Sequence, residues 1–150
     1  MEIKLKIDEE LLFNLWKEIE DSTNIRLVIN SIKGWNISVT LDCRYVSNAN
    51  NILLRLSSPL DVDLYVVGVR ENTIILKYVM TPFLLLLHGR FVVDHIKNNT
   101  THRELEILTE EKRVLVHLDG FKKMKKLLSA AQPIDVALDN DTMTLNMILT

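Results

Sequence analysis

The stretch TPFLLLLHGRFVVDHIK, residues 81–97, decides how this 150-residue chain is interpreted. Thr81 suits an N-cap and Pro82 suits the first helical position. At 100° per residue, its Asp, Arg and Lys side chains fall within one wedge of about 60°, and apolar side chains cover most of the remaining surface. The pattern predicts a helix that other protein, a partner or lipid must surround. The charged side chains are those of Arg90, Asp94 and Lys97.

A hairpin that turns at His88–Gly89 is the competing interpretation, because a two-residue turn can use glycine. It fits the sequence less well. Four consecutive leucines do not alternate between two faces, and the charged side chains no longer share one side. We therefore expect one buried helix, packed under antiparallel strands.

Composition places the chain among ordinary folded proteins. Hydrophobic residues make up 47% and charged residues 25%, which is typical of a globular chain. The length indicates a single α+β domain over residues 1–150. A net charge of −2 argues against a nucleic-acid-binding protein, which usually carries a basic excess. The single cysteine, Cys43, excludes an internal disulfide framework and a cysteine-rich zinc site.

Targeting and membrane signals are not evident in the sequence. The start MEIKLKIDEELL has no apolar segment after a basic one, so it does not read as a signal peptide. The longest uncharged run, Tyr78 to Gly89, has 12 residues, fewer than the roughly 18–20 that span a bilayer. We expect a soluble cytoplasmic protein without a transmembrane segment.

Alternating apolar and polar residues predict several antiparallel strands. Residues 3–7 read as a strand, Asp8 as the N-cap of an amphipathic helix, and residues 25–42 as a hairpin that turns at Lys33–Gly34. Further strands are predicted at 52–56, 61–69, 73–80, 105–108, 113–118, 134–138 and 143–149. Tyr65, Val67 and Val69 would share one face of their strand, and Ile74, Leu76 and Tyr78 one face of the next.

The order strand, Asp, helix, hairpin occurs twice. KLKIDEELLFNLWKEI (residues 4–19) can be laid over LVHLDGFKKMKKLLSA (residues 115–130) with Asp8 on Asp119. One interpretation is two β-α-β-β units joined by a central meander. The other is chance similarity between short α+β patterns.

The sequence nominates no catalytic, metal or cofactor site. His88, His95 and His102 are spaced by seven residues, so two of them on one helix lie roughly 10 Å apart, too far to share an ion. DNDTMT, residues 139–144, begins like a calcium loop but lacks its later ligands, and it predicts a hairpin turn. GxSxG, HExxH, CxxC and a glycine-rich phosphate loop are absent. We expect no enzyme activity and no cofactor.

The two amphipathic helices carry opposite charge. Solvated outer faces explain this, but two sharper alternatives stay open: the helices face each other, or the basic one meets anionic lipid. The charged residues are Glu9, Glu10, Glu18 and Glu20 in the first helix and Lys122, Lys123, Lys125 and Lys126 in the second.

The succession VGVRENTIILKYVM, TPFLLLLHGRFVVDHI and KRVLVHLDGFKKMKKLLSAAQPIDVALDNDTMTLNMIL resembles small tubular lipid-binding (TULIP) domains. The resemblance is one of element order over roughly residues 60–149, without a signature motif. It implies long strands that wrap an apolar helix, and a groove between them that holds lipid acyl chains. No binding residue is carried over from that family.

Two functional hypotheses follow. The first is a non-enzymatic binding module for an apolar or lipid-like ligand, inside an α+β fold whose antiparallel sheets wrap a central apolar helix. Its ligand-binding residues would be Leu84, Leu87, Phe91, Tyr65 and Tyr78. The second is a structural or interaction protein whose apolar surfaces are used by its own core or by a homodimer.

Overall fold

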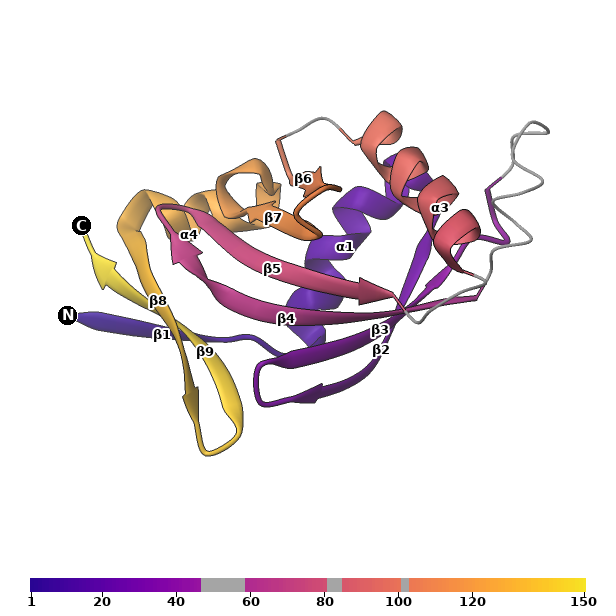
Figure 1. Cartoon of the computed structure of the whole chain (residues 1–150). Coiled ribbons are helices and arrows are strands. Elements are labelled where there is room, and N and C mark those ends of the chain that lie inside the picture. The colour runs from indigo at the N-terminus through magenta and orange to yellow at the C-terminus, as the bar shows by residue number, and fades with distance from the viewer. Residues whose placement is uncertain (47–58, 81–84, 101–102) are drawn as a thin grey trace.

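The computed structural model describes residues 1–46, 59–80, 85–100 and 103–150, and of residues 85–89 it describes the backbone alone. These residues form an α+β fold with two antiparallel sheets (Figure 1). One sheet has the strand order β1-β9-β8 and the other β2-β3-β4-β5-β7-β6. The strands are β1 (Glu2–Lys6), β2 (Arg26–Lys33), β3 (Asn36–Asp42), β4 (Leu60–Arg70), β5 (Thr73–Met80), β6 (Leu105–Leu108), β7 (Arg113–His117), β8 (Ala131–Asp139) and β9 (Thr142–Leu149), and the α-helices are α1 (Glu9–Thr23), α3 (Leu85–Asn99) and α4 (Lys125–Ala130).

The three-stranded sheet joins the two ends of the chain. Strand β1 pairs antiparallel with β9, so both termini lie on the same side of the molecule (Figure 1). Strands β8 and β9 form the hairpin predicted at the end of the chain. Its turn residues Asn140 and Asp141 have φ of 50° and 63°, as a type I′ turn requires. Pro133 lies in β8, an edge strand, where its missing N–H is tolerated.

The six-stranded sheet has one buried face and one exposed face. In β3, Ile37, Val39 and Leu41 are buried, and the residues between them are partly exposed. This alternation confirms the predicted hairpin of β2 and β3, whose turn contains Gly34 at φ 58°. We call the face that carries Ile37, Val39 and Leu41 the inner face.

Helix α1 begins and ends as its sequence predicts. The Asp8 carboxylate accepts a hydrogen bond from the Leu11 amide at 2.9 Å, which confirms the N-cap. At the other end Asn24 has φ 57°, and its amide donates to the Glu20 carbonyl at 2.8 Å. This left-handed residue ends the helix and turns the chain into β2.

Helix α3 replaces the hairpin considered for the same residues. The backbone is helical through His88–Gly89, so the hairpin interpretation is wrong, while the predicted start at Thr81 and Pro82 lies outside the described residues. The structure does not confirm that strands wrap this helix. Val92, Val93 and Ile96 are buried, but Phe91 is 40% exposed and Arg90 and Asp94 are exposed, because one side of α3 packs on the protein and the other faces solvent (Figure 1).

The segment after β7 differs from its prediction. Instead of one helix capped by Asp119, it forms two short 3₁₀ turns, Leu118–Gly120 and Lys122–Met124, followed by α4. Asp119 lies inside the first turn and makes no capping hydrogen bond there. The two suggested β-α-β-β units also do not form separate modules. The first strand of one unit, β1, pairs with β9 of the other, and β7 pairs with β5 and β6.

Candidate functional site

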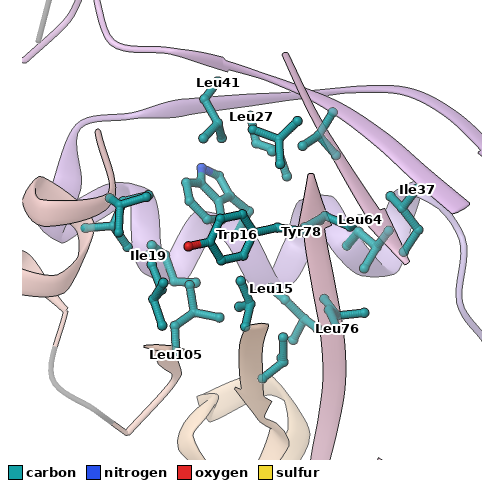
Figure 2. Close-up of a pocket in the computed structure, with 18 of the residues that line it drawn as sticks. Leu15, Trp16, Ile19, Leu27, Ile37, Leu41, Leu64, Leu76, Tyr78 and Leu105 are labelled. Carbon is teal, nitrogen blue, oxygen red and sulfur yellow. The ribbon is translucent and has the colours of Figure 1, made fainter. Parts of the chain in front are cut away.

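A cavity of about 150 Å³ lies between α1, α3 and the inner face of the six-stranded sheet. Every described residue that lines it is aliphatic, aromatic or methionine, and together they come from both helices, all six strands and the segment around Phe121. Figure 2 shows Leu15, Trp16 and Tyr78 among these residues. This convergence makes the cavity the strongest candidate site among the described residues.

Local periodicity explains how each element presents apolar side chains to the cavity. On α1, Leu15 and Ile19 are four residues apart and point to the same side. On β5, Leu76 and Tyr78 are two residues apart and share the inner face. An apolar stripe of a helix therefore meets an apolar face of a sheet, with Val93 of α3 at the same cavity.

Trp16 forms a fixed part of the wall. Its indole Nε1–H donates a hydrogen bond to the Ile25 carbonyl at 2.8 Å. The bond ties α1 to the start of β2 and satisfies the one polar atom of the indole. The ring can therefore present an apolar surface to the cavity.

Tyr78 lines this site with its ring, because the surface of the cavity is almost entirely apolar. The residue is 7% exposed, and its hydroxyl forms no hydrogen bond with any residue that the structure describes. Burial raises the pKa of the Tyr78 phenol above its ordinary value of 10.0, so the group stays protonated at neutral pH. The phenol oxygen points toward the Ile19 side of the cavity (Figure 2).

The size of the cavity limits what it can hold. A volume of about 150 Å³ matches cavities that take up benzene and lies below the roughly 300–1,000 Å³ of pockets for drug-sized ligands. A second, smaller cavity of about 40 Å³ lies toward the three-stranded sheet and is lined in part by Leu5, Ile7 and Leu145. This second space is the size of a packing gap.

The five residues predicted to bind a ligand are not brought together. Tyr78 lines the cavity, whereas Phe91 is 40% exposed on α3. Leu84 lies outside the described residues, and for Leu87 the described part is the backbone within α3. Tyr65 is 41% exposed and lies on the outer face of the sheet.

Strand register explains the position of Tyr65. Leu64 is paired with Tyr78 and Tyr65 with Lys77, so Tyr65 and Tyr78 point to opposite faces. The face that Tyr65, Val67 and Val69 were expected to share is also interrupted, because a bulge lies between Val66 and Gly68.

Sequence reasoning missed the contribution of α1. The helix after Asp8 was predicted to be amphipathic, but its apolar residues Leu15, Trp16 and Ile19 were not assigned to a ligand site. The stripe shows that α1 packs on something. Its partner, the inner face of β3 to β5, follows from the order of strands in the sheet, which no local pattern encodes.

A polar network lies on the outer face of the same sheet. Thr73 Oγ1 is 2.9 Å from His117 Nδ1, and His117 Nε2 is 3.3 Å from Glu106 Oε2. An ionised Glu106 carboxylate only accepts, so Nε2 donates to it, and in the neutral imidazole Nδ1 then accepts from the Thr73 hydroxyl. The order hydroxyl, imidazole, carboxylate resembles that of a general-base triad. Here it links neighbouring strands β5, β7 and β6, and both cavities described above lie on the other face.

Of the three histidines spaced by seven residues, the structure describes the side chain of His95. His95 Nε2 lies 2.8 Å from the Thr23 carbonyl and therefore donates to it, which ties α3 to the end of α1. The side chains of His88 and His102 lie outside the described residues. In the part of the chain that the structure describes, no group of three or more His, Cys, Asp or Glu residues could hold a metal ion. No helix within those residues is long and apolar enough to cross a membrane.

Comparisons with known proteins assign no function to this site. The chain was compared with protein-family models, with curated proteins and with solved structures, and none of the three gave a match. The resemblance to TULIP domains therefore stays a prediction.

Proposed function

We propose that the protein is a non-enzymatic binding module for a small apolar ligand held between α1, α3 and the six-stranded sheet. The observation that carries the proposal is the cavity of about 150 Å³ with aliphatic and aromatic walls. Protein interiors are normally close-packed. The described residues do not fully enclose this space, so an apolar molecule bound there would remove the apolar walls from water and would be held by the hydrophobic effect.

The volume sets the class of ligand. It suits one six-membered ring or the end of a single alkyl chain, and it is too small for a two-chain lipid. The proposed ligand is therefore smaller than the acyl chains that the TULIP resemblance implies. Ring-shaped probes are the natural first choice for a test.

The test uses benzene and n-hexane as probes, with binding followed by thermal shift and by methyl NMR. A ligand that binds only the folded state raises the Tm in proportion to the logarithm of its concentration above the Kd. We expect benzene to raise the Tm and to shift methyl signals of Leu15, Ile19 and Val93, which line the cavity. Organic extraction of purified protein followed by mass spectrometry should identify the natural ligand.

Two variants give the control. Val114→Phe places a ring into the cavity from β7, whereas Val136→Phe adds the same bulk on β8, away from the described lining of both cavities. Both valines are half-buried. We expect Val114→Phe to abolish the benzene shift and Val136→Phe to retain it. The proposal fails if neither probe shifts the Tm or the methyl signals of the unmodified chain.

A homodimer or other interaction role is the second candidate. Exposed apolar side chains on or beside the outer face of the six-stranded sheet favour it: Trp35, Tyr65, Val67 and Val79. Acidic Asp61 and Asp63 and basic Lys77 interrupt this surface. Light scattering between about 10 and 500 μM tests the alternative, and a constant monomer mass together with benzene binding would favour the ligand-binding role.

A further inference from the structure

The segment between β7 and β8 carries a dense group of exposed lysines. Its apolar residues Phe121 and Met124 are buried and three positions apart, so they hold the segment against the core. Apolar residues at this spacing leave the positions between them on the outer side of a helical segment. We call the exposed lysines on that side the basic cluster: Lys122, Lys123, Lys125 and Lys126.

The backbone of the basic cluster is held in place, but its ammonium groups are not paired. Both carboxylate oxygens of Glu18 accept from backbone amides, those of Lys122 at 2.7 Å and Lys123 at 3.3 Å. No side chain of the basic cluster forms an ion pair or a hydrogen bond with a residue that the structure describes. Four positive charges therefore face solvent on one short segment.

The basic cluster contrasts with the charge of the whole chain. The net charge is −2, so acidic residues outweigh basic ones elsewhere. Asp119 is the nearest acidic residue in the sequence, and its single charge cannot offset four lysines. The charge pattern is therefore complementary to an anionic partner that touches the protein at this one place, and it disfavours a polyanion that wraps around the molecule.

The residues beside the basic cluster favour a membrane over a nucleic acid. Helix α4 has no fully buried residue, and its Leu127 and Leu128 are half-buried next to the lysines. Lysines beside partly exposed aliphatic side chains are typical of segments that lie at a lipid headgroup boundary. Proteins that bind single-stranded nucleic acid instead stack bases on aromatic side chains, and the one aromatic residue of segment 118–130, Phe121, is buried.

We propose that the basic cluster binds the surface of an anionic phospholipid bilayer, with Leu127 and Leu128 at the headgroup boundary. The proposal goes beyond the ligand-binding function and does not depend on the cavity. One lysine near an anionic membrane surface strengthens binding about fivefold, so four together give measurable attachment.

The experiment measures co-sedimentation with vesicles of phosphatidylcholine alone and of phosphatidylcholine with about 30 mol% phosphatidylserine. We expect the unmodified chain to bind the anionic vesicles and not the neutral ones, despite its negative net charge. The affinity should fall at least about tenfold when the salt concentration rises from about 0.1 to 0.5 M, because salt screens the attraction.

Two quadruple variants with the same change of net charge give the matched comparison. We expect substitution of the basic cluster to weaken binding to the anionic vesicles by about a hundredfold or more, and substitution of four exposed lysines elsewhere to keep the affinity within about threefold. The first variant is Lys122→Gln, Lys123→Gln, Lys125→Gln and Lys126→Gln, and the control is Lys4→Gln, Lys6→Gln, Lys33→Gln and Lys77→Gln.

Folding of the variants is checked by thermal unfolding. All eight side chains are exposed, so the Tm should stay within about 2 °C of the unmodified chain. If the first quadruple variant does not fold, the single variants Lys123→Gln and Lys126→Gln carry the test, and each should weaken vesicle binding about fivefold.

Three results overturn the proposal: no binding to the anionic vesicles, equal binding to the neutral ones, or equal losses in the two quadruple variants. Tighter binding of a single-stranded or duplex oligonucleotide in fluorescence anisotropy, lost in the first variant, would also overturn it and assign the basic cluster to nucleic acid. Val114→Phe, which fills the cavity, should retain vesicle binding in full. Failure of the membrane proposal and failure of the ligand-binding function are therefore distinguishable.

Discussion

Gly120 is a residue at which the chain has no room for a side chain. A Cβ atom built there would overlap the carbonyl oxygen of Arg103 and lie 2.9 Å from the Glu104 amide nitrogen. The neighbouring segment is held in place, because the His117 amide donates to the Glu104 carbonyl at 2.8 Å. Even the smallest substitution must therefore displace backbone.

We predict that Gly120→Ala lowers the free energy of unfolding by about 2–4 kcal/mol, the range of severe backbone and packing defects. Gly68→Ala is the matched control, since a Cβ at Gly68 meets nothing within 4 Å. Alanine in that strand should be neutral or stabilise by up to about 1 kcal/mol. Urea denaturation measures both, and equal effects of the two substitutions would contradict this account.

Cys43 is fully buried, and desolvation, followed by the nearby carboxylate of Asp42, raises the pKa of its thiol from 9.0 to about 11. Below about pH 8 the thiol is almost entirely neutral in both the folded and the unfolded chain. Between pH 9 and 11 the unfolded chain loses this proton and the folded chain keeps it, so stability falls as pH rises.

We predict that the unmodified chain loses stability relative to Cys43→Ala over pH 9–11 and that the difference between the two is constant from pH 6 to 8. Urea midpoints at each pH measure it, and the comparison cancels the titration of other groups. The native thiol should also react with a thiol reagent far more slowly than the urea-unfolded chain at pH 8. A difference that does not change between pH 8 and 10.5 would show that the thiol titrates alike in both states.

At the scale of elements, Glu18 links α1 to the segment that leads into α4. Its carboxylate accepts hydrogen bonds from the backbone amides of Lys122 at 2.7 Å and Lys123 at 3.3 Å. These amides begin a helical segment and have no partner within it. The acidic helix therefore meets the basic segment at the 3₁₀ turn Lys122–Met124, through a carboxylate and backbone N–H groups.

We predict that Glu18→Ala lowers the free energy of unfolding by about 1 kcal/mol, as loss of a capping side chain does. Glu20→Ala is the control, because the Glu20 side chain makes no hydrogen bond or ion pair with the residues described in the structure. Glu18→Gln should have an intermediate effect. If Glu18→Ala and Glu20→Ala prove equally mild in thermal unfolding, the carboxylate contributes nothing as a cap.

Elements whose apolar residues recur with a clear period could be predicted from the sequence. Elements whose structure depends on packing against neighbouring segments could not. Alternation located β3 and β5, and Asp8 located the start of α1. The spacing of Phe121, Met124 and Leu127 fits a helix, yet the chain there forms 3₁₀ turns beside the backbone of residues 103–104. For the site, Tyr78 was predictable from its strand, but the bulge near Val66 and the meeting of β5 with α1 depend on tertiary contacts.

At the scale of the whole molecule, the two sheets share one hydrophobic core. Leu145 and Met147 of β9 belong to the same buried cluster as Ile37 of β3 and Leu15 of α1. Leu145 also lines the smaller cavity together with Ile37. Because no separate core lies between β1, β8 and β9 among the described residues, the three-stranded sheet should not unfold alone.

We predict that Leu145→Ala lowers the free energy of unfolding by about 2–5 kcal/mol, the usual cost of a cavity in a core. In native-state hydrogen exchange, the most protected amides of β3 and β9 should lose protection by the same amount, since they exchange through one global opening. Ile134→Ala on β8 is the control, because that side chain is 44% exposed and its removal should cost less than about 1 kcal/mol. Loss of protection confined to β1, β8 and β9 would instead mean that the three-stranded sheet opens as an independent unit, and the cavity beneath α1 would then have to be supported by the six-stranded sheet and its helices alone.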